Sequence, residues 1–462
     1  MKKNILIPIF ILMFVSGYHP DTYAQEHLQT FKSSVIKALS HNKSIQNANL
    51  ENEKVAFDRE EVQGKLLPKV SLNALYGYMN TGLDIDLPTQ QLPITGINLF
   101  EGTTKGNVSS QVFTTGVTAT QVLFSGLQIT NGKKALEQKY KAQTLLIEAG
   151  YDQLAQEVIT SYDQLMLLKE VDLLINDSEK RLNKEHLKVV KAIENGVAIP
   201  YDRDKIKLAM LELESKRAEV KSNRDLLYYK LEELTGLSSH ELKEVTYALQ
   251  QIVLTDESTA MNRKELEALE ASHKALEYVL KKEKGAQLPM LFAFGNVSYF
   301  NAFNMKSTIK DVPQLGDLHF KSNHLQMAPS FAVGVGMKWN IFEGKSHKAH
   351  VQKAKLDLQI QDNKLADTKE KLSLLQRKTQ SDYELALKKV SVNQQQMTIA
   401  KNNLHLATRQ FEEGLQDVTE RLEAENEYYK QSLNYYNQVL NQRLTATEVM
   451  KSNGNLYQTI IR

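Results

Sequence analysis

The stretch from Pro329 to Gly344 combines a period of two with a glycine at its end. The residues at even-numbered positions are mostly small or polar, and those at odd-numbered positions are mostly apolar. The apolar set is Phe331, Val333, Val335, Met337, Trp339 and Ile341. This alternation is typical of a β-strand with one apolar and one polar face. It is the pattern of a membrane barrel, in which lipid-facing and lumen-facing side chains alternate along each strand.

A second stretch, Val112 to Gly126, repeats this design 218 residues earlier, counted from Gly126 to Gly344. Both stretches end in Phe-x-Gly and lead into a long polar segment without proline. The first such segment runs from Leu127 to Glu194 and carries apolar residues at near-heptad spacing. These residues are Leu154, Val158, Leu165, Leu168 and Ile175. The spacing predicts a helix of roughly 100 Å that packs in a coiled coil.

Each long helix is predicted to end at a glycine and to be followed by a returning helix. The first hairpin turns near residues 196–200 and returns from Tyr201 to Leu234. The second long helix, Lys345 to Glu412, turns near residues 414–418 and returns from Val418 to Lys451. Glycine is the usual residue after the last turn of a helix. Gly414 follows Gly344 at the same distance at which Gly196 follows Gly126, so the two long helices should have equal lengths.

The segments before these strands also occur twice. In the first repeat, a helical pattern over 28–66 is followed by Leu67-Pro68 and then by an alternating stretch from Lys69 to Met79. In the second repeat, a helical pattern over 262–284 is followed by Leu288-Pro289 and then by an alternating stretch from Met290 to Phe300. Residues 81–110 and 301–328 have no sustained period, and we expect them to form long external loops. The sequence therefore predicts two structural repeats, residues 25–261 and 262–462.

The N-terminus has the features of a secretory signal peptide. Lys2 and Lys3 precede the apolar run Ile5 to Val15, and Ala24 provides a small residue at a cleavage site. A membrane anchor is the alternative, but the run is shorter than the roughly 20 residues that a spanning helix needs. We assign residues 1–24 to the signal peptide, and expect any membrane insertion of the mature chain to use strands.

Composition excludes several classes of protein. Hydrophobic residues make up 42% of the chain, and 57 basic residues nearly balance 55 acidic ones, so nucleic acid is not an expected partner. The absence of cysteine excludes disulfides, thiolate metal sites and a cysteine nucleophile. His347 and His350 could face one metal ion, but no third ligand is evident. With no phosphate loop or nucleophile elbow either, we expect neither an enzyme nor a bound metal or cofactor.

Two strands per repeat give four strands per chain, which are too few to close a barrel. An open sheet in lipid would leave backbone N–H and C=O groups unpaired, at a cost of several kcal/mol each. The chain must therefore oligomerise, and a homotrimer would supply twelve strands. We expect a mainly α-helical fold with duplicated helical hairpins and four strands that complete a trimeric outer-membrane β-barrel.

These features together resemble the TolC family of outer-membrane efflux and secretion channels. The resemblance covers the whole mature chain and rests on the duplicated order of its motifs: Leu67-Pro68 with Leu288-Pro289, 122–126 (VLFSG) with 340–344 (NIFEG), 196–202 (GVAIPYD) and 414–424 (GLQDVTERLEA). It implies a trimeric, passive duct in the outer membrane of a Gram-negative bacterium, with a long periplasmic extension. A periplasmic adaptor and an inner-membrane transporter would be its partners, in efflux or in type I secretion.

The resemblance also implies roles for residues at the helical tip. Glu420 and Glu423 match two carboxylates, one turn apart, that ring the channel entrance; a solvated helix face is the alternative. Asp202 matches a residue that latches the hairpins, but Phe411 and Gln416 replace its expected tyrosine and arginine partners. If that latch is missing, Arg421 or Arg203 could replace it.

Two further sets of residues are candidates for contact with partners and lipid. The glycines and apolar residues of the tip resemble the grooves where adaptors dock, although helix capping alone would explain the glycines. This set is Gly196, Val197, Ala198, Gly414, Leu415 and Val418. Aromatic residues near the strand ends could form interface belts or simply pack within the sheet. This set is Tyr76, Tyr78, Tyr299 and Trp339.

Two other readings stay open from the sequence alone. The long helices would also suit a periplasmic coiled-coil adaptor or scaffold without a pore, but the alternating strands argue against it. A secreted helical hydrolase has only scattered carboxylates in its favour.

Overall fold

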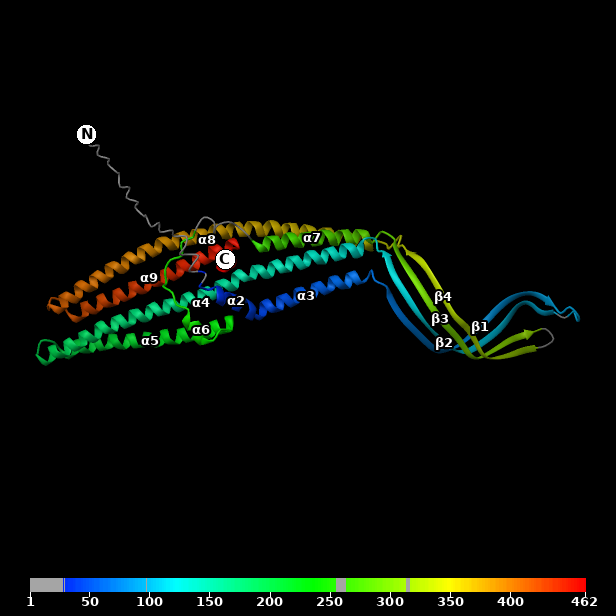
Figure 1. Cartoon of the computed structure of the whole chain (residues 1–462), viewed down its shortest axis with the longest axis horizontal. Helices are drawn as coiled ribbons and strands as arrows, with labels where there is room; N and C mark the ends of the chain where they lie inside the picture. Colours follow the sequence, from blue (N-terminus) through cyan, green and yellow to red (C-terminus); the bar gives the residue numbers. More distant parts are fainter. Residues whose placement is uncertain (1–27, 29, 97, 255–262, 313–315) are drawn as a thin grey trace, which may run out of the picture. The chain divides into compact units, whose positions relative to one another are not determined.

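The structure is a computed structural model that describes residues 28, 30–96, 98–254, 263–312 and 316–462. The predicted signal peptide lies outside these residues. The chain divides into two compact units, each described separately below (Figure 1). The helical unit is formed by Met1–Glu53, Lys141–Ala271 and Asp362–Arg462, and the sheet unit by Lys54–Tyr140 and Ser272–Gln361. Among the described residues, no helix is both long enough and apolar enough to span a membrane.

The sheet unit contains four antiparallel strands in the order β1-β2-β3-β4. Their bounds are β1 Lys69–Gln91, β2 Asn98–Phe124, β3 Met290–Val312 and β4 Gly316–Lys338. Each strand pairs with the next in sequence, so β1 and β4 are the two edges. The prediction of two strands from each half of the chain is confirmed.

The predicted long loops at residues 81–110 and 301–328 are wrong. Most of these residues extend the strands, and pairing continues through Asp84↔Lys105 in the first hairpin and Lys306↔Lys321 in the second. Alternation in these segments is not sustained, the run from Leu83 to Leu87 being the clearest short example, whereas backbone pairing continues without a sustained period. The irregularities are local: a register shift between Leu87 and Gln90 brackets Pro88, which has no N–H to donate.

The two faces of the sheet differ as the alternation predicts. Directly paired residues share a face, so Leu72, Val117, Val297 and Phe331 form one row across the four strands. Leu72 is 73% exposed and Phe331 is 79% exposed, so this face is apolar and uncovered in the single chain. We call it the apolar face. On the other face, Phe292 and Phe294 lie opposite Gly336 and Gly334, whose missing side chains leave room for the rings.

The helices also occur in pairs of equal length. The two long helices, α4 (Gln128–Glu194) and α8 (Ser346–Glu412), have 67 residues each. Their returning partners, α5 (Pro200–Thr235) and α9 (Val418–Asn453), have 36 residues each, and α3 (Lys43–Gly64) and α7 (Lys264–Gly285) have 22 each. The predicted duplicated hairpins are confirmed.

The short helices were not predicted. The expected helix over 28–66 is broken at Asn42, whose extended backbone ends α2 (Lys32–His41) and whose side chain accepts a hydrogen bond from the N–H of Ile45 in α3. Asparagine is favoured at such a helix start because its side chain satisfies an otherwise free N–H. Helices α6 (Ser239–Glu244) and α10 (Leu456–Ile461) are the other short elements.

The predicted seam of α4 is the centre of the helical core. Leu154, Val158, Leu165 and Ile175 are buried, and Leu168 is half-buried. Around Val158, the core collects residues from α2, α5, α8, α9 and α10, with Phe31 packing against Tyr162 at a ring-centroid distance of 5.7 Å. The apolar stripe of a long polar helix is thus covered by neighbours that are distant in sequence.

The glycine between β2 and α4 is needed for two separate reasons. Gly126 has φ = 64°, and a Cβ built on it would lie 2.3 Å from the carbonyl oxygen of Gly285. Its counterpart Gly344 has the same φ of 64°, but nothing lies within 4 Å of a Cβ there. The two glycines therefore share the backbone requirement but not the close approach.

This difference gives a matched pair of substitutions. We expect Gly126→Ala to destabilise the folded protein by about 1–3 kcal/mol more than Gly344→Ala, because only the first change forces two backbones apart. The measurement is the temperature at which the monomer of each variant, refolded in detergent at a concentration too low for assembly, loses its folded band on a semi-native gel. Equal losses would contradict the close approach of Gly126 to Gly285.

Candidate functional site

The tip of the helical unit consists of the two turns that join each long helix to its returning helix. Gly196 and Gly414 both have φ = 72°, the left-handed conformation that glycine adopts easily. In the second turn, the carboxylate of Asp417 accepts hydrogen bonds from the N–H groups of Thr419 and Glu420, at 2.8 and 2.9 Å. The bond from Glu420 is the main reason why the pKa of Asp417 is lowered. Asp417 thus fixes the start of α9.

The proposed docking residues differ in their exposure. Val197 is 81% exposed and Leu415 is 74% exposed, so each turn presents one apolar side chain to solvent. Val418 is only 2% exposed, because it is the first residue of α9 and packs against the apolar seam between the hairpins. In this conformation of the chain, Val418 is therefore not presented to solvent as Val197 and Leu415 are.

Helix α9 carries two different stripes near the tip. Val418, Arg421, Glu425 and Tyr429 are buried at a spacing of three and four residues. Glu420 and Glu423, one turn apart, are exposed on another face of the same helix. The structure therefore leaves both candidate aperture carboxylates exposed to solvent, while the buried stripe fixes the rotation of α9.

The four candidate latch residues do not form one cluster in the chain. Asp202 is half-buried and accepts a hydrogen bond from the N–H of Ile199 at 3.4 Å, so it caps its own helix. Phe411 packs against the apolar cluster of the tip. Gln416 is half-buried in the second turn. Of these four residues, Arg421 forms an ion pair between the two hairpins, and its partners are acidic residues that sequence reasoning missed.

Arg421 is fully buried and belongs to a network of four charged residues. Its Nη2 atom lies 2.5 Å from Glu185 Oε1 on α4 and 2.9 Å from Glu425 Oε2 on α9. Arg181 on α4 then contacts both carboxylate oxygens of Glu425, at 2.7 Å through Nη2 and 3.1 Å through Nε. We call these four residues the tip charge network. Its two positive and two negative charges balance.

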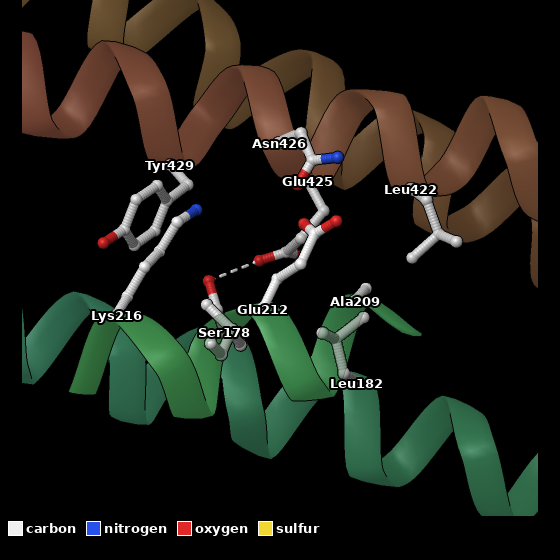
Figure 2. A pocket seen from close by; sticks show the side chains of 10 residues that line it. Ser178, Leu182, Ala209, Glu212, Lys216, Leu422, Glu425, Asn426 and Tyr429 are labelled. Carbon is white, nitrogen blue, oxygen red and sulfur yellow. Dashed lines mark hydrogen bonds between the residues drawn. The ribbon is translucent and has the colours of Figure 1, made fainter. Parts of the chain in front are cut away.

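Ser178 completes the network on its α4 side. Its hydroxyl donates to Glu425 Oε1 at 2.7 Å, and Figure 2 shows this bond crossing from α4 to α9. Burial would raise the pKa of Glu425, but the hydrogen bond and charge of Arg181 outweigh it, so the pKa is lowered. Burial keeps the pKa of Glu185 raised despite the opposing charge of Arg421. Glu425 is thus the firmly ionised member.

A small cavity lies beside Glu425, between α4, α5 and α9. Figure 2 shows Lys216 and Tyr429 on one side of it and Leu182, Ala209 and Leu422 on the other. Lys216 Nζ stands 4.3 Å from the ring centroid of Tyr429. The cavity has about 10 Å³ of space, close to what one water molecule needs, so it is a packing feature of the tip.

Two polar contacts nearer the turns also join the hairpins. Lys188 on α4 contacts Glu412 on α8 at 2.6 Å, and the pKa of Glu412 is lowered by this hydrogen bond and charge. Lys205 on α5 donates to the hydroxyl of Thr419 on α9 at 2.6 Å. Neither pair was predicted, since these residues read as solvated helix faces.

The candidate belt residues divide between two levels of the sheet. Tyr76 and Tyr78, on the apolar face, are 65% and 70% exposed. Tyr299 is half-buried and packs against Phe113 on the same face, with ring centroids 6.3 Å apart. Trp339 lies just beyond the end of β4, not within the strand as predicted, and its Nε1 donates to the carbonyl oxygen of Gln287 at 3.0 Å.

No metal site emerges from the described residues: no three His, Asp or Glu side chains among them are grouped to hold an ion. His347 and His350 both lie in the first turns of α8.

Comparison with solved structures identifies the class of protein that has this fold. The outer-membrane channel OprN matches with a TM-score of 0.71 and 15% identity, over 96% of this chain and 94% of that one. The Campylobacter jejuni CmeC outer membrane channel matches with a TM-score of 0.67 and 14% identity, over 94% and 86%. The Neisseria gonorrhoeae MtrE outer membrane channel, solved in an open state, gives 0.66 and 18%, over 94% and 90%. The fold is that of outer-membrane channels.

A protein-family model matches the second half of the sequence. Residues 257–455 match the family model of the outer membrane efflux protein, which covers most of the second predicted repeat. This match confirms the resemblance found in the sequence, the general class of efflux channel and the outer membrane as the location of the protein.

Proposed function

We propose that three copies of this chain form a passive duct across the outer membrane, which serves a tripartite efflux pump or a type I secretion system. The observation that carries the proposal is the open, four-stranded sheet with an exposed apolar face. Such a sheet is stable in lipid only when its edges β1 and β4 are paired. Pairing between copies closes the barrel, and three copies give twelve strands.

The duplication indicates how the edges would pair. Strand β4 is the counterpart of β2, and β1 is the counterpart of β3. Since β2 pairs with β3 within the chain, β4 of one copy would pair with β1 of the next. Gly344 would then approach Gly64 of the neighbour, as Gly126 approaches Gly285 within the chain. This explains why Gly344 and Gly64 both have open space around them here.

An exposed apolar stripe on α8 supports the same assembly. Leu385, Val392, Ile399 and Leu406 recur every seven residues and are 51–57% exposed. A heptad spacing of this kind is the pattern of a helix that packs against another helix. A neighbouring copy would cover the stripe when the hairpins gather into a helical cylinder.

The register predicts a specific cross-link between copies. Within the chain, Ala119 pairs with Gly295. Met337 lies seven residues before Gly344 as Ala119 does before Gly126, and Ala74 lies six residues after Pro68 as Gly295 does after Pro289. In the cysteine-free chain, M337C/A74C should therefore form disulfides between copies, because directly opposite strand residues lie within disulfide reach. The measurement is a ladder of dimers and trimers on a non-reducing gel after mild oxidation.

Two controls set the limits of this test. A119C/G295C should form the same bond within one chain and stay monomeric. M337C/L72C shifts the register by two residues and should cross-link poorly. Monomers alone from M337C/A74C, with A119C/G295C oxidised in the same sample, would overturn the proposed edge pairing.

The tip of the helical unit would be the gate and the docking site. The exposed Glu420 and Glu423 of three copies would place six carboxylates around the entrance, and cations would be favoured there. Val197 and Leu415, with the glycine turns and Ala198, would receive the adaptor hairpin. The latch would depend on the tip charge network through Arg421, together with Lys188–Glu412 and Lys205–Thr419. The inner-membrane transporter would provide the energy and select the cargo.

A further inference from the structure

The apolar face of the sheet changes its chemistry abruptly toward the hairpin ends. Tyr78, Gln111, Phe303 and His324 form one row across the four strands. The next paired row outward is Asn80, Ser109, Lys306 and Lys321, which β3 reaches across a register shift next to Asn304, a residue with φ = 51°. Both lysines are exposed, and they are direct partners across β3 and β4. Two positive charges therefore stand side by side just past Tyr78 and Phe303.

This lysine pair has no counter-charge in its surroundings. The row beyond it consists of Gly82, Asn107, Thr308 and His319, so neither adjoining row contains an acid. Among the described residues, neither lysine forms an ion pair. Like charges placed directly opposite each other destabilise a sheet, so the arrangement is best satisfied by an external anion.

The height of the pair on the sheet matches the membrane surface. β3 advances twelve residues from Leu291 to Phe303, both on the apolar face. At about 3.3 Å per residue and a tilt of about 45°, this is about 28 Å along the membrane normal, close to the apolar band of about 25 Å in outer-membrane barrels. Lys306 and Lys321 come directly after it, at the level of lipid headgroups.

We propose that Lys306 and Lys321 form a binding site for the phosphate groups of anionic lipid headgroups. The inference rests on the proposed function, because it requires the apolar face to meet lipid. Each ammonium group is a compact donor suited to phosphate, and the exposed His319 and His324 flank the pair. The imidazole Nδ1 of His319 is already 3.0 Å from the hydroxyl of Thr308, which holds the ring on β4 near the lysines.

Lys105 and Lys310 provide a matched comparison farther from the membrane. Lys105 lies four residues beyond Ser109 on β2 and has Asp84 directly opposite it. Lys310 lies four residues beyond Lys306 on β3 and is also exposed. These two lysines carry the same charge as the pair, but they are farther from the headgroup level, and Lys105 faces an acid.

The test uses the full-length protein in nanodiscs of phosphatidylcholine. Phosphatidic acid, or diacylglycerol with the same acyl chains, is added, and the number of lipids retained is counted by native mass spectrometry. We expect K306Q/K321Q to weaken phosphatidic acid binding about thirtyfold, given the roughly 1 kcal/mol that each basic residue gains near anionic lipid. K105Q/K310Q should change it by less than threefold, and diacylglycerol binding should be equal in all three proteins.

Unchanged phosphatidic acid binding by K306Q/K321Q would overturn the proposal, as would an equal loss with K105Q/K310Q. Failure of the wild-type protein to enter nanodiscs as a trimer would instead contradict the proposed function. The two failures are therefore distinguishable.

Discussion

Arg421→Met is expected to loosen the tip of the helical unit more than any other single change to a charged residue there. The substitution removes a fully buried cation and leaves the buried carboxyl group of Glu185 without its partner on α9. Removing one partner of a buried ion pair typically lowers the free energy of unfolding by about 3–5 kcal/mol. We expect amide hydrogen exchange in residues 178–189 and 418–429 to accelerate at least a hundredfold, because each 1.4 kcal/mol of opening free energy is about a factor of ten.

Two further variants test this explanation. R421M/E185L removes the unpaired carboxyl group and leaves Arg181 with Glu425, so it should recover most of the lost protection. R203M removes an arginine whose partner Asp204 is exposed, and it should change exchange less than fivefold. If R421M and R203M behave alike, the tip charge network does not hold the hairpins together. In cells, we expect R421M to admit large antibiotics that the wild-type protein excludes.

The sequence predicted the parts of the fold where one face of an element differs from the other. Leu72 and Phe331 alternate with polar neighbours because one side of the sheet is apolar, and Val158 recurs in a seam because one side of α4 is covered. Beyond Asn80 and Ser109 the only clear alternation in β1 and β2 is the short run from Leu83 to Leu87, which Pro88 follows, so no sustained period indicated the pairing. The break at Asn42 follows one hydrogen bond, which a helical pattern on both sides conceals.

The tip charge network shows a second limit of sequence reasoning. Arg421 and Glu425 are in phase with the buried Val418 and Tyr429, at a spacing of three and four residues. This spacing indicates that the two charged side chains lie on the buried face of α9, and the sequence alone could have shown it. Their partners Arg181 and Glu185 are also in phase with buried residues of α4, Ser178 and Leu182. Which helix faces which is fixed by the tertiary packing, so the pairing itself could not be predicted.

Replacing Glu420 and Glu423 together with glutamine is expected to remove most of the cation selectivity of the reconstituted channel. The two side chains are exposed one turn apart on α9, and three copies would bring six carboxylates to one entrance. Glutamine keeps the size and removes the charge, so conductance should persist while the cation-to-anion permeability ratio, measured from reversal potentials in a planar bilayer, falls at least threefold toward one.

The salt dependence of that change identifies its cause. The difference between the proteins should be larger at 0.1 M than at 1 M salt, because the Debye length falls from about 10 Å to about 3 Å. Glu370→Gln on α8 removes one exposed carboxylate far along the chain from the tip and should leave the ratio within experimental error. An unchanged ratio in E420Q/E423Q at low salt would mean that the entrance charges lie elsewhere on α9. Glu427, exposed one turn beyond Glu423, would then be the next residue to neutralise, because it continues the same exposed stripe.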